Sequence, residues 1–302
     1  LFSIKFLKIL LKSILAIASH SKYEEIVNKP KIENCEFMVI SWCYKKNFFS
    51  DGSFQDRYFN ENSENLKNSF WILISMDGYV PSNLKNNIKI LRKKSGIFKY
   101  NLFSFVRIFV STVIDCRFSP KKILHYFFFH SYFAKLVTSI VTKDLKKNKF
   151  RAILLPYEAQ PFQNKIFLES KKINEKIINI GYLHSLPPLT SELVYRSGAP
   201  DLLMVHGENQ IKMLKKILNW PEKKLILIKS LRFRSNHENL SNKIYIPLSL
   251  HDENKFIKEF KKLLINSSKN YFPKFNIKNH PAIYNSKKHL KFQRKLEEII
   301  KI

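Results

Sequence analysis

Six short apolar runs dominate the sequence, and stretches of a different pattern separate them. They cover residues 36–43, 70–76, 152–157, 177–183, 202–206 and 225–228. Runs of this length that are apolar at nearly every position are typical of strands buried on both faces. Helical patterns lie between several of them, and this alternation predicts an α/β fold with a parallel sheet and helices on both faces. In such sheets, ligands bind beyond the carboxyl ends of the strands.

Two of the intervening stretches show clear helical periodicity. Residues 161–174 and 208–218 both repeat apolar side chains every three to four positions, which predicts one buried stripe on each helix. The second helix is expected to end before Pro221, because proline cannot continue a helix.

A change of pattern at residues 229–243 predicts a domain boundary, because the stretch is polar and strand and helix patterns resume after it. We expect an amphipathic N-terminal helix at 1–30, a Rossmann-like domain at 31–235 with a helical insertion near 100–148, and a partial Rossmann-like domain at 243–302. The last region has about sixty residues, fewer than a full domain of this kind needs, so the second lobe is expected to be truncated.

Two apolar segments raise the question of a membrane. In residues 1–18, Lys5, Lys8 and Lys12 fall on one face of a helix. These lysines interrupt the segment too often for a bilayer span. The pattern suits a helix lying on an anionic membrane surface, or equally a helix packing on its own domain. Residues 100–148 are likewise interrupted by histidine and lysine, and we expect buried helices there rather than membrane contact.

The chain is strongly basic, with 53 Lys and Arg against 24 Asp and Glu and a net charge of +29. Such a charge attracts nucleic acid, an acidic membrane surface or phosphorylated substrates. The lysines are dispersed, and the sequence has no RNP-type motif, zinc finger or Arg-rich arm, so nucleic acid is disfavoured. Cys35, Cys43 and Cys116 form no CxxC pair, which suits reduced thiols in a cytoplasmic protein.

Two polar residues directly follow buried runs and are candidate catalytic groups. Glu158 follows the run at 152–157, and His184 follows the run at 177–183. A carboxylate and an imidazole on adjacent edges of the sheet are the side chains best able to remove a proton from a hydroxyl nucleophile. Each has a structural alternative: Glu158 could cap the following helix, and His184 could hydrogen-bond its own loop.

A third strand end, in the second α/β region, contains Lys278, His280 and Pro281. Proline is favoured in the first turn of a helix, so His280 would lie at a helix amino terminus, where backbone N–H groups favour a phosphate. Lys278 adds positive charge, and the group predicts a seat for a diphosphate. An ordinary turn at His280 and Pro281 is the alternative.

The segment DGSFQDRYF (51–59) follows the first buried run. Gly52 would let this loop approach a ligand closely, and Asp51, Asp56 and Arg57 could contact acceptor hydroxyls or a phosphate. The alternative is a surface loop with a local Asp–Arg pair.

The remaining candidates come from two other segments. His206 and Gly207 end another buried run, with Gly207 expected at a helix amino terminus and His206 facing the same cleft edge. Arg232 lies near the predicted hinge, where it could meet a phosphate or be a solvated linker charge.

Several of these segments together resemble a known group of enzymes. They are DGSFQDRYF (51–59), YEAQPFQNKIF (157–167), IGYLHSLPP (180–188), PDLLMVHGENQ (200–210), SLRF (230–233) and KNHP (278–281). Their order is similar to that in bacterial surface-carbohydrate biosynthesis proteins of the GT-B glycosyltransferase kind. It is more distantly similar to the CDP-glycerol glycerophosphotransferases and the sialyl- and Kdo-transferases.

The resemblance implies a GT-B-like fold of two Rossmann-like lobes, with the acceptor domain at 31–235 and the partial donor domain at 243–302, and a role for each matching residue. His184 or Glu158 would act as the base, and Lys278, His280 and Pro281 would bind the donor phosphate. His184 is followed by Ser185, where the glycerophosphotransferases usually have glycine. The sequence has no DxD-like motif or metal-ligand spacing, so we expect no metal and no cofactor beyond a nucleotide-sugar substrate.

The sequence therefore predicts a glycosyltransferase that moves a sugar from a nucleotide-activated donor to a surface polysaccharide, such as capsule or O-antigen, or to a lipid-linked glycan. We expect it in the cytoplasm, peripheral on the anionic inner face of the cell membrane. A glycerophosphotransferase- or sialyltransferase-like enzyme is the alternative within the same class. A non-catalytic basic protein that binds nucleic acid or membrane is the alternative outside it.

Overall fold

A computed structural model of the chain describes residues 23–27, 35–66, 68–93, 110, 114, 129–184, 191–231, 244–247, 253–266, 275–278 and 287–301. The chain divides into two compact units, Leu1–Arg234 and Ser235–Ile302. We describe each unit by itself.

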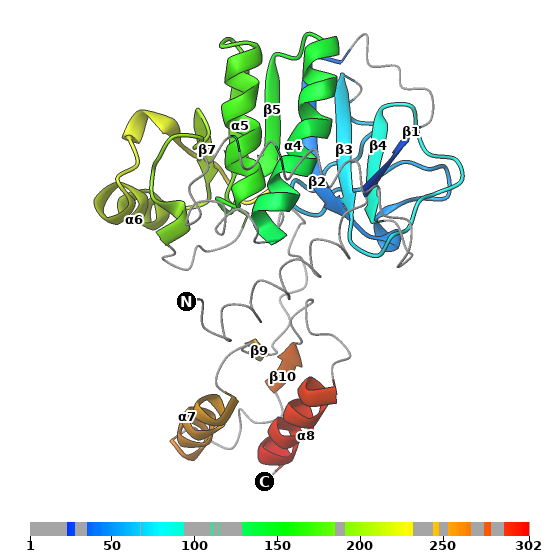
Figure 1. The fold of residues 1–302 in the computed structure, drawn as a ribbon. Helices are drawn as coiled ribbons and strands as arrows, with labels where there is room; N and C mark the ends of the chain where they lie inside the picture. Colours follow the sequence, from blue (N-terminus) through cyan, green and yellow to red (C-terminus); the bar gives the residue numbers. More distant parts are fainter. Residues whose placement is uncertain are drawn as a thin grey trace, which may run out of the picture. The chain divides into compact units, whose positions relative to one another are not determined.

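The described strands and helices of the first unit are shown in Figure 1. The strands are β1 (Tyr23–Val27), β2 (Phe37–Cys43), β3 (Ser69–Ser75), β4 (Ile88–Lys93), β5 (Ala152–Pro156), β6 (Ile178–Tyr182), β7 (Leu202–Val205) and β8 (Leu225–Leu227). The α-helices are α4 (Phe129–Lys147), α5 (Pro161–Ile173) and α6 (Glu208–Leu218), and the 3₁₀ turns are η1 (Lys45–Asn47), η2 (Ser191–Leu193) and η3 (Glu222–Lys224).

In the described part of this unit the strands form one eight-stranded sheet, in the order β1-β4-β3-β2-β5-β6-β7-β8. Strand β1 pairs with β4 in the antiparallel direction, and every other neighbouring pair is parallel. The structure thus confirms the α/β class and the mostly parallel sheet. It also adds β1 and β4, which the apolar runs did not predict.

Alternate residues of the strands build two separate cores, as the pleat of a sheet requires. Met38 and Ile40 of β2 join the core under α4, α5 and α6. Val39 and Cys43 of the same strand join the opposite core. Helices α4 and α5 lie side by side on the first face (Figure 1).

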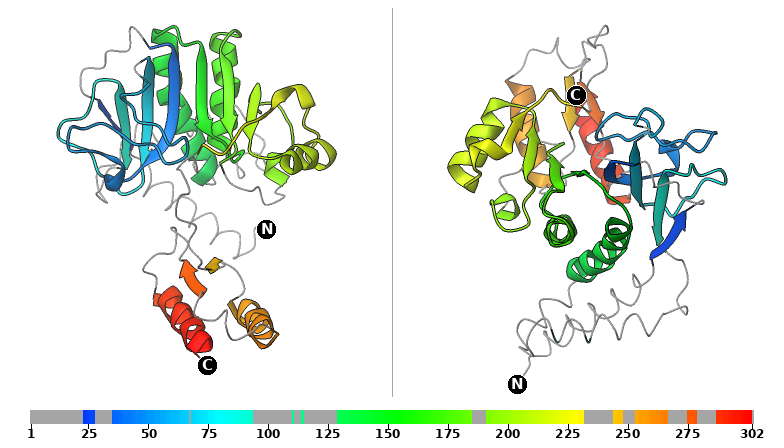
Figure 2. Two further views of the ribbon diagram at one scale, coloured as in Figure 1. Left: turned by 180° about the vertical axis from the view of Figure 1, so that it is seen from behind. Right: turned by 90° about the horizontal axis from the view of Figure 1, so that it is seen from above.

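Loop residues, among them Phe54 and Phe59, cover the opposite face. From behind, no described helix of this unit stands in front of the strands (Figure 2). In the described residues the helices therefore cover one face, whereas the sequence predicted helices on both. The described part of the connection from β2 to β3 forms only η1 and irregular turns, and its residues cover the second face in place of a helix.

The start of the chain differs in part from the expectation of a helix over residues 1–30. Residues 23–27 form β1, because their backbone pairs with β4 from Lys89 to Lys93 and Glu25 contacts the buried ammonium group of Lys89. Residues 1–22 lie outside the described residues. So does most of the stretch 100–128, whereas α4 accounts for the end of the predicted helical insertion.

The described part of the second unit contains two parallel strands and two helices. They are β9 (Ile244–Pro247), α7 (Glu253–Ile265), β10 (Phe275–Lys278) and α8 (Lys287–Lys301). The two helices share a small core that includes Phe260 and Leu264 of α7 and Phe292 and Leu296 of α8. Repetition of apolar residues every three to four positions explains why each helix has one buried side.

Candidate functional site

The turn from β5 to α5 is held rigidly by one buried glutamine. Gln163 is 1% exposed, and its Oε1 accepts hydrogen bonds from the backbone N–H groups of Glu158 (2.9 Å) and Gln160 (3.0 Å). Its Nε2 donates to the carbonyl oxygen of Pro156 at 2.6 Å. Ala159 adopts the left-handed conformation with φ 56°. The backbone of Glu158 is therefore fixed by the same contacts that begin the helix.

The carboxylate of Glu158 faces His184. One oxygen, Oε2, accepts a hydrogen bond from Nε2 of Gln160 at 2.8 Å, and the other, Oε1, lies 3.4 Å from Nε2 of His184. The side chain of Glu158 is 46% exposed and that of His184 is 10% exposed. Glu158 does not cap α5, because Gln160 occupies the N-cap position.

The register of two parallel strands brings the pair together. Pro156 of β5 is paired with Tyr182 of β6, and each candidate residue follows its strand by two positions. The backbone N–H of Leu183 still donates to the carbonyl of Met204 at 3.0 Å, so His184 is the first residue beyond this bonding pattern. Equal offsets from paired positions explain why a carboxylate and an imidazole 26 residues apart in sequence meet at one edge.

This edge lies at the point where the winding of the sheet reverses. Along the chain, β3 and β4 are added on one side of β2, and β5 to β8 are added on the other. In open parallel sheets the crevice outside the carboxyl ends at such a reversal is the usual ligand site. Glu158 follows β5, one of the two strands that flank the reversal, and the loop after β2 comes to the same place.

That loop (residues 44–66, called the β2–β3 loop below) brings Tyr58 against His184. The two ring centroids are 4.5 Å apart, and the ring planes are inclined by 74°. This is the edge-to-face geometry that aromatic rings favour. The sequence analysis did not single out Tyr58, because nothing in the sequence indicates how far this loop returns along the sheet.

Asp56 fixes the β2–β3 loop from inside. It is fully buried, and its Oδ1 accepts hydrogen bonds from the backbone N–H groups of Tyr58 and Phe59, each at 2.7 Å. Its Oδ2 accepts a hydrogen bond from the hydroxyl group of Ser41 on β2. Burial raises the pKa of Asp56, while these hydrogen bonds act in the opposite direction. The structure thus gives Asp56 internal partners, whereas the sequence suggested contact with an acceptor.

Asp51, near the start of the loop, also has partners within the protein. Asp51 accepts hydrogen bonds from the N–H (3.0 Å) and hydroxyl (2.7 Å) of Ser53, which together lower its pKa, and it lies 3.5 Å from Nζ of Lys85. Its ion-pair partner is thus Lys85, whereas the sequence suggested a local Asp–Arg pair. Arg57 is exposed to solvent.

Gly52 is required by a close approach within the protein itself. It has φ 81°, and a Cβ at this position would lie 1.9 Å from the carbonyl oxygen of Asn83. The sequence analysis expected Gly52 to give space to a ligand. The space is instead filled by the backbone of the neighbouring loop.

His206 and Gly207 lie two strands away from β5, where β7 passes into α6. The backbone N–H of His206 donates to Oε1 of Gln210 at 2.8 Å, and its ring packs on that of Tyr182 at 5.1 Å. Burial lowers the pKa of His206. Gly207 is the N-cap of α6 with an extended backbone (φ −155°), and a Cβ there would meet nothing within 4 Å.

The turns from β5 to α5 and from β7 to α6 are stabilised in the same way. In each, a glutamine in the first turn of the helix accepts a hydrogen bond from the backbone N–H of a residue one or two positions after the strand: Gln163 from Glu158, and Gln210 from His206. Neither residue was predicted from the sequence. Gln163 lies three residues after the N-cap Gln160 and completes a capping box, which is a pattern that can be sought in a sequence, whereas Gly207 at the N-cap of α6 has no side chain to form one.

The predicted donor-phosphate residues belong to other parts of the chain. Lys278 is the last residue of β10 in the second unit, whereas Arg232, His280 and Pro281 lie outside the described residues. Within the described ranges, no cluster of three or more His, Cys, Asp or Glu side chains could hold a metal ion.

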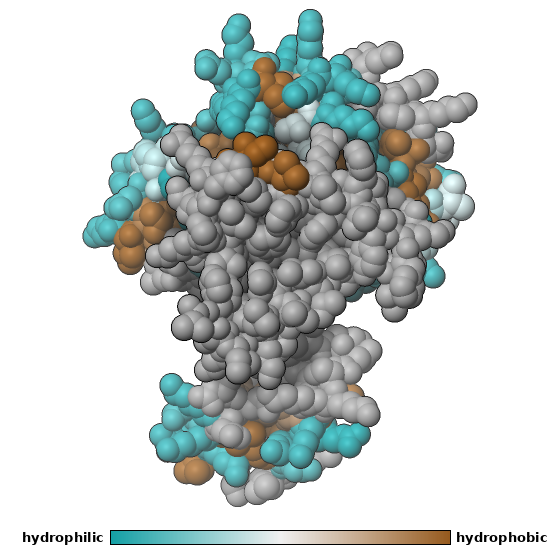
Figure 3. Space-filling view, viewed as in Figure 1, coloured by the Kyte–Doolittle hydropathy of each residue, from teal (hydrophilic) through white to brown (hydrophobic). Residues whose placement is uncertain are grey.

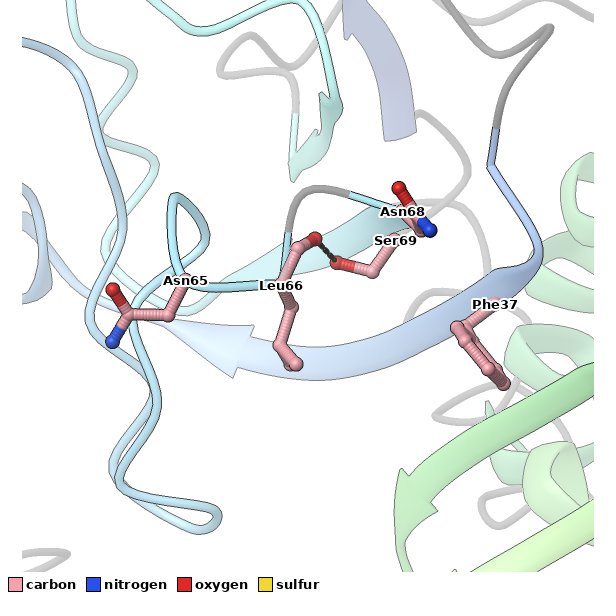
Figure 4. Close-up of a pocket in the computed structure, with 5 residues that line it drawn as sticks. All are labelled: Phe37, Asn65, Leu66, Asn68 and Ser69. Carbon is pink, nitrogen blue, oxygen red and sulfur yellow. Dashed lines mark hydrogen bonds between the residues drawn. The ribbon is translucent and has the colours of Figure 1, made fainter.

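Two hollows lie at the opposite, amino-terminal edge of the sheet. The smaller, of about 310 Å³, is lined by Phe37, Asn65, Leu66, Asn68 and Ser69 (Figure 4). The larger, of about 1000 Å³, lies by the starts of β2, β5 and β6. Because ligands of open parallel sheets bind at the carboxyl ends, neither hollow is the candidate active site.

Comparisons with known proteins do not establish the function of this chain. No protein-family model and no curated protein matches the chain. Among solved structures, the chain is similar to the crystal structure of a glycosyltransferase from Rickettsia africae, with 13% sequence identity and a TM-score of 0.41. The match covers 88% of this chain, which spans 65% of the length of that one. At this level the likeness does not indicate a reaction or a substrate.

Proposed function

We propose that the chain is a glycosyltransferase that moves a sugar from a nucleotide-activated donor to a hydroxyl of a surface polysaccharide or lipid-linked glycan. The observation that supports this most directly is the pair of Glu158 and His184, with 3.4 Å between Oε1 and Nε2, at the carboxyl edge of the sheet beside the reversal of winding. A sugar hydroxyl needs a base of this kind to become a nucleophile.

The exposures of the two side chains suggest a division of labour. Glu158, at 46% exposed, is the group that an acceptor hydroxyl would reach, and His184, at 10%, is its inner partner. The acceptor oxygen forms a bond to the anomeric carbon while the bond from that carbon to the donor phosphate breaks. The nucleotide leaves with the bonding electron pair. The hydroxyl proton passes to Glu158, whose Oε1 lies 3.4 Å from Nε2 of His184.

The departing phosphate requires positive charge. We assign this role to Lys278, His280 and Pro281, the residues that the resemblance matches to a donor-phosphate site, with Arg232 as a further cation and without a metal. Stabilisation of the charge that develops in the transition state is commonly the largest contribution to catalysis. Removal of one hydrogen-bond donor that provides it lowers the rate by about 10²–10³-fold.

The net charge of +29 supports an anionic setting for the acceptor, and we place the enzyme peripherally on the inner face of the cell membrane, in capsule or O-antigen synthesis. Among the helices described, none has the length and apolar character to cross a bilayer. The described residues visible in Figure 3 are mainly hydrophilic, with hydrophobic residues in separate patches.

The first test is a thermal-shift screen of the chain against CMP, CDP, UDP, GDP and dTDP sugars, because a ligand that binds the folded state raises Tm by mass action. Transfer is then measured with the stabilising donor. Glu158→Gln and His184→Gln should each lower turnover by at least about 10²-fold with Tm nearly unchanged. Glu175→Gln, which alters an exposed glutamate beyond α5, is the matched control. Full turnover in both site variants would remove the pair from the mechanism.

The same screen separates the alternatives. Stabilisation by CDP-glycerol or CMP-sialic acid alone would assign the chain to a glycerophosphotransferase- or sialyltransferase-like enzyme with the same base. A non-catalytic basic protein would bind nucleic acid or anionic vesicles and would not discriminate among nucleotides. The logarithm of its binding affinity would fall linearly with the logarithm of the salt concentration.

A further inference from the structure

Tyr58 reaches the catalytic pair from a different part of the sheet. It belongs to the β2–β3 loop, whereas Glu158 and His184 follow β5 and β6. Its ring meets the imidazole edge to face, with 4.5 Å between centroids. Because His184 is only 10% exposed, a neighbour in direct ring contact strongly restricts how the imidazole can turn.

The position of Tyr58 is itself fixed by its neighbours in sequence. Asp56 accepts the N–H groups of Tyr58 and of Phe59, so the peptide on each side of Tyr58 is held. Phe59 is 2% exposed and packs on Tyr182 of β6 at 5.5 Å between ring centroids. Ser41 joins the same carboxylate to β2. These contacts connect the loop to β2 and to β6.

We propose that Tyr58 is a positioning residue for His184 and that Asp56 is the group that holds Tyr58 in place. This inference rests on the proposed function, in which His184 and Glu158 act together. Tyr58 acts through the imidazole, keeping Nε2 directed at the carboxylate of Glu158. Asp56 acts one step further away, through the backbone on either side of Tyr58.

Burial of Asp56 supports a positional role over simple packing. A fully buried carboxylate costs free energy, and burial raises its pKa accordingly. An apolar side chain of similar size would fill the same space without that cost. What the carboxylate adds is a set of three accepted hydrogen bonds with defined directions, from Ser41, Tyr58 and Phe59.

The first test measures how quickly diethyl pyrocarbonate modifies His184, by peptide mass mapping of the whole chain. His206 of the same molecule is the internal reference, and Tm is recorded for every variant. Tyr58→Leu should raise the rate at His184 several-fold relative to His206, because the covering ring is gone. Tyr58→Phe keeps the ring and should restore the wild-type rate.

The second pair of variants tests the role of Asp56. Asp56→Ala removes the acceptor of three hydrogen bonds and should raise the rate at His184 as Tyr58→Leu does. Asp56→Asn keeps an oxygen for the two N–H groups and should remain close to wild type. Asp51→Ala is the matched control, because Asp51 also accepts two hydrogen bonds within this loop but is exposed. It should leave the rate at His184 unchanged.

An activity measurement with the donor found by the screen completes the test. Tyr58→Leu should lower kcat by at least about tenfold while the KM for the donor stays constant, and Tyr58→Phe should recover most of kcat. If the wild-type chain transfers no sugar, the proposed function fails, and the modification rates still decide whether Tyr58 and Asp56 hold His184. An unchanged rate in Tyr58→Leu, or equal effects of Leu and Phe at this position, would overturn the inference.

Discussion

Lys89 is buried in the first unit, and its replacement is predicted to be one of the most damaging single changes outside the site. Its Nζ lies 2.6 and 2.9 Å from the two carboxylate oxygens of Asp144 on α4, and 3.0 Å from Oε2 of Glu25 on β1. The side chains of Lys89 and Asp144 are 5% and 6% exposed, against 29% for Glu25. The pair therefore joins the sheet to the helix layer in a region that water hardly reaches.

The magnitude follows from what each variant leaves behind. Lys89→Met leaves the carboxylate of Asp144 buried without its cation, which should cost about 3–5 kcal/mol of unfolding free energy. Asp144→Leu leaves Lys89 with the half-buried Glu25, and about 2 kcal/mol is expected. The double variant leaves no buried charge at this position and should lie within about 1–2 kcal/mol of wild type. The single effects are thus expected to be strongly non-additive.

Tryptophan fluorescence in urea suits this measurement. The three tryptophans, Trp42, Trp71 and Trp220, all lie in the first unit, so their emission reports the unit that contains the pair. Glu25→Gln is the control, and a loss of about 1 kcal/mol or less is expected because the ion pair is partly exposed. If the double variant lost the sum of the two single effects, the buried charges would not be coupled and the reasoning would be refuted.

Three further predictions concern single residues. Gly52→Ala should cost about 2 kcal/mol or more, because a left-handed backbone and an overlap with the backbone of Asn83 cannot be relieved by a side-chain movement, whereas Gly207→Ala should stay within about 0.5 kcal/mol in the same urea titration. Burial raises the pKa of the Cys43 thiol to about 12, so at pH 8 only about one thiol in 10⁴ is ionised, and a thiol reagent should label it only after unfolding; rapid labelling of the native chain would contradict this. Burial lowers the pKa of His206 below its ordinary 6.5, so the unfolded chain binds the proton first as pH falls. The free energy of unfolding should therefore decrease from pH 6.5 down to the folded-state pKa. His206→Gln should flatten this part of the curve of stability against pH, and an unchanged slope would show that other groups cause it.

The sequence predicted the strands whose side chains are apolar on both faces. Strands β2, β3 and β5 to β8 each coincide with an apolar run to within a few residues. Strand β4 was missed because its sequence IKILRK places Lys89 at a buried position, which only the distant partners Asp144 and Glu25 make tolerable. Helix α8 had a readable signal, since Phe292, Leu296 and Ile299 follow a helical repeat that was not used.

The pairing of Glu158 with His184 was predictable because both follow adjacent parallel strands by the same number of residues. Tyr58 was not predictable in this way. Its place depends on a loop without a regular repeat, whose course is set by a buried carboxylate and by two phenylalanine anchors, Phe54 and Phe59. The pattern of apolar runs predicts residues at strand ends, but it does not predict residues that a loop brings from another strand.

The candidate site is held by buried residues, whereas exposed positions beside it can change without loss of the fold. The turn that carries Glu158 is locked by Gln163 to the start of a helix, so few replacements there would leave the helix intact. Within the β2–β3 loop, Asp56 and Phe59 are buried and hold Tyr58 in place, whereas the adjacent Arg57 is exposed. Under the proposed function, replacements at such exposed positions would change the groups that meet a substrate while Glu158 and His184 stay as they are.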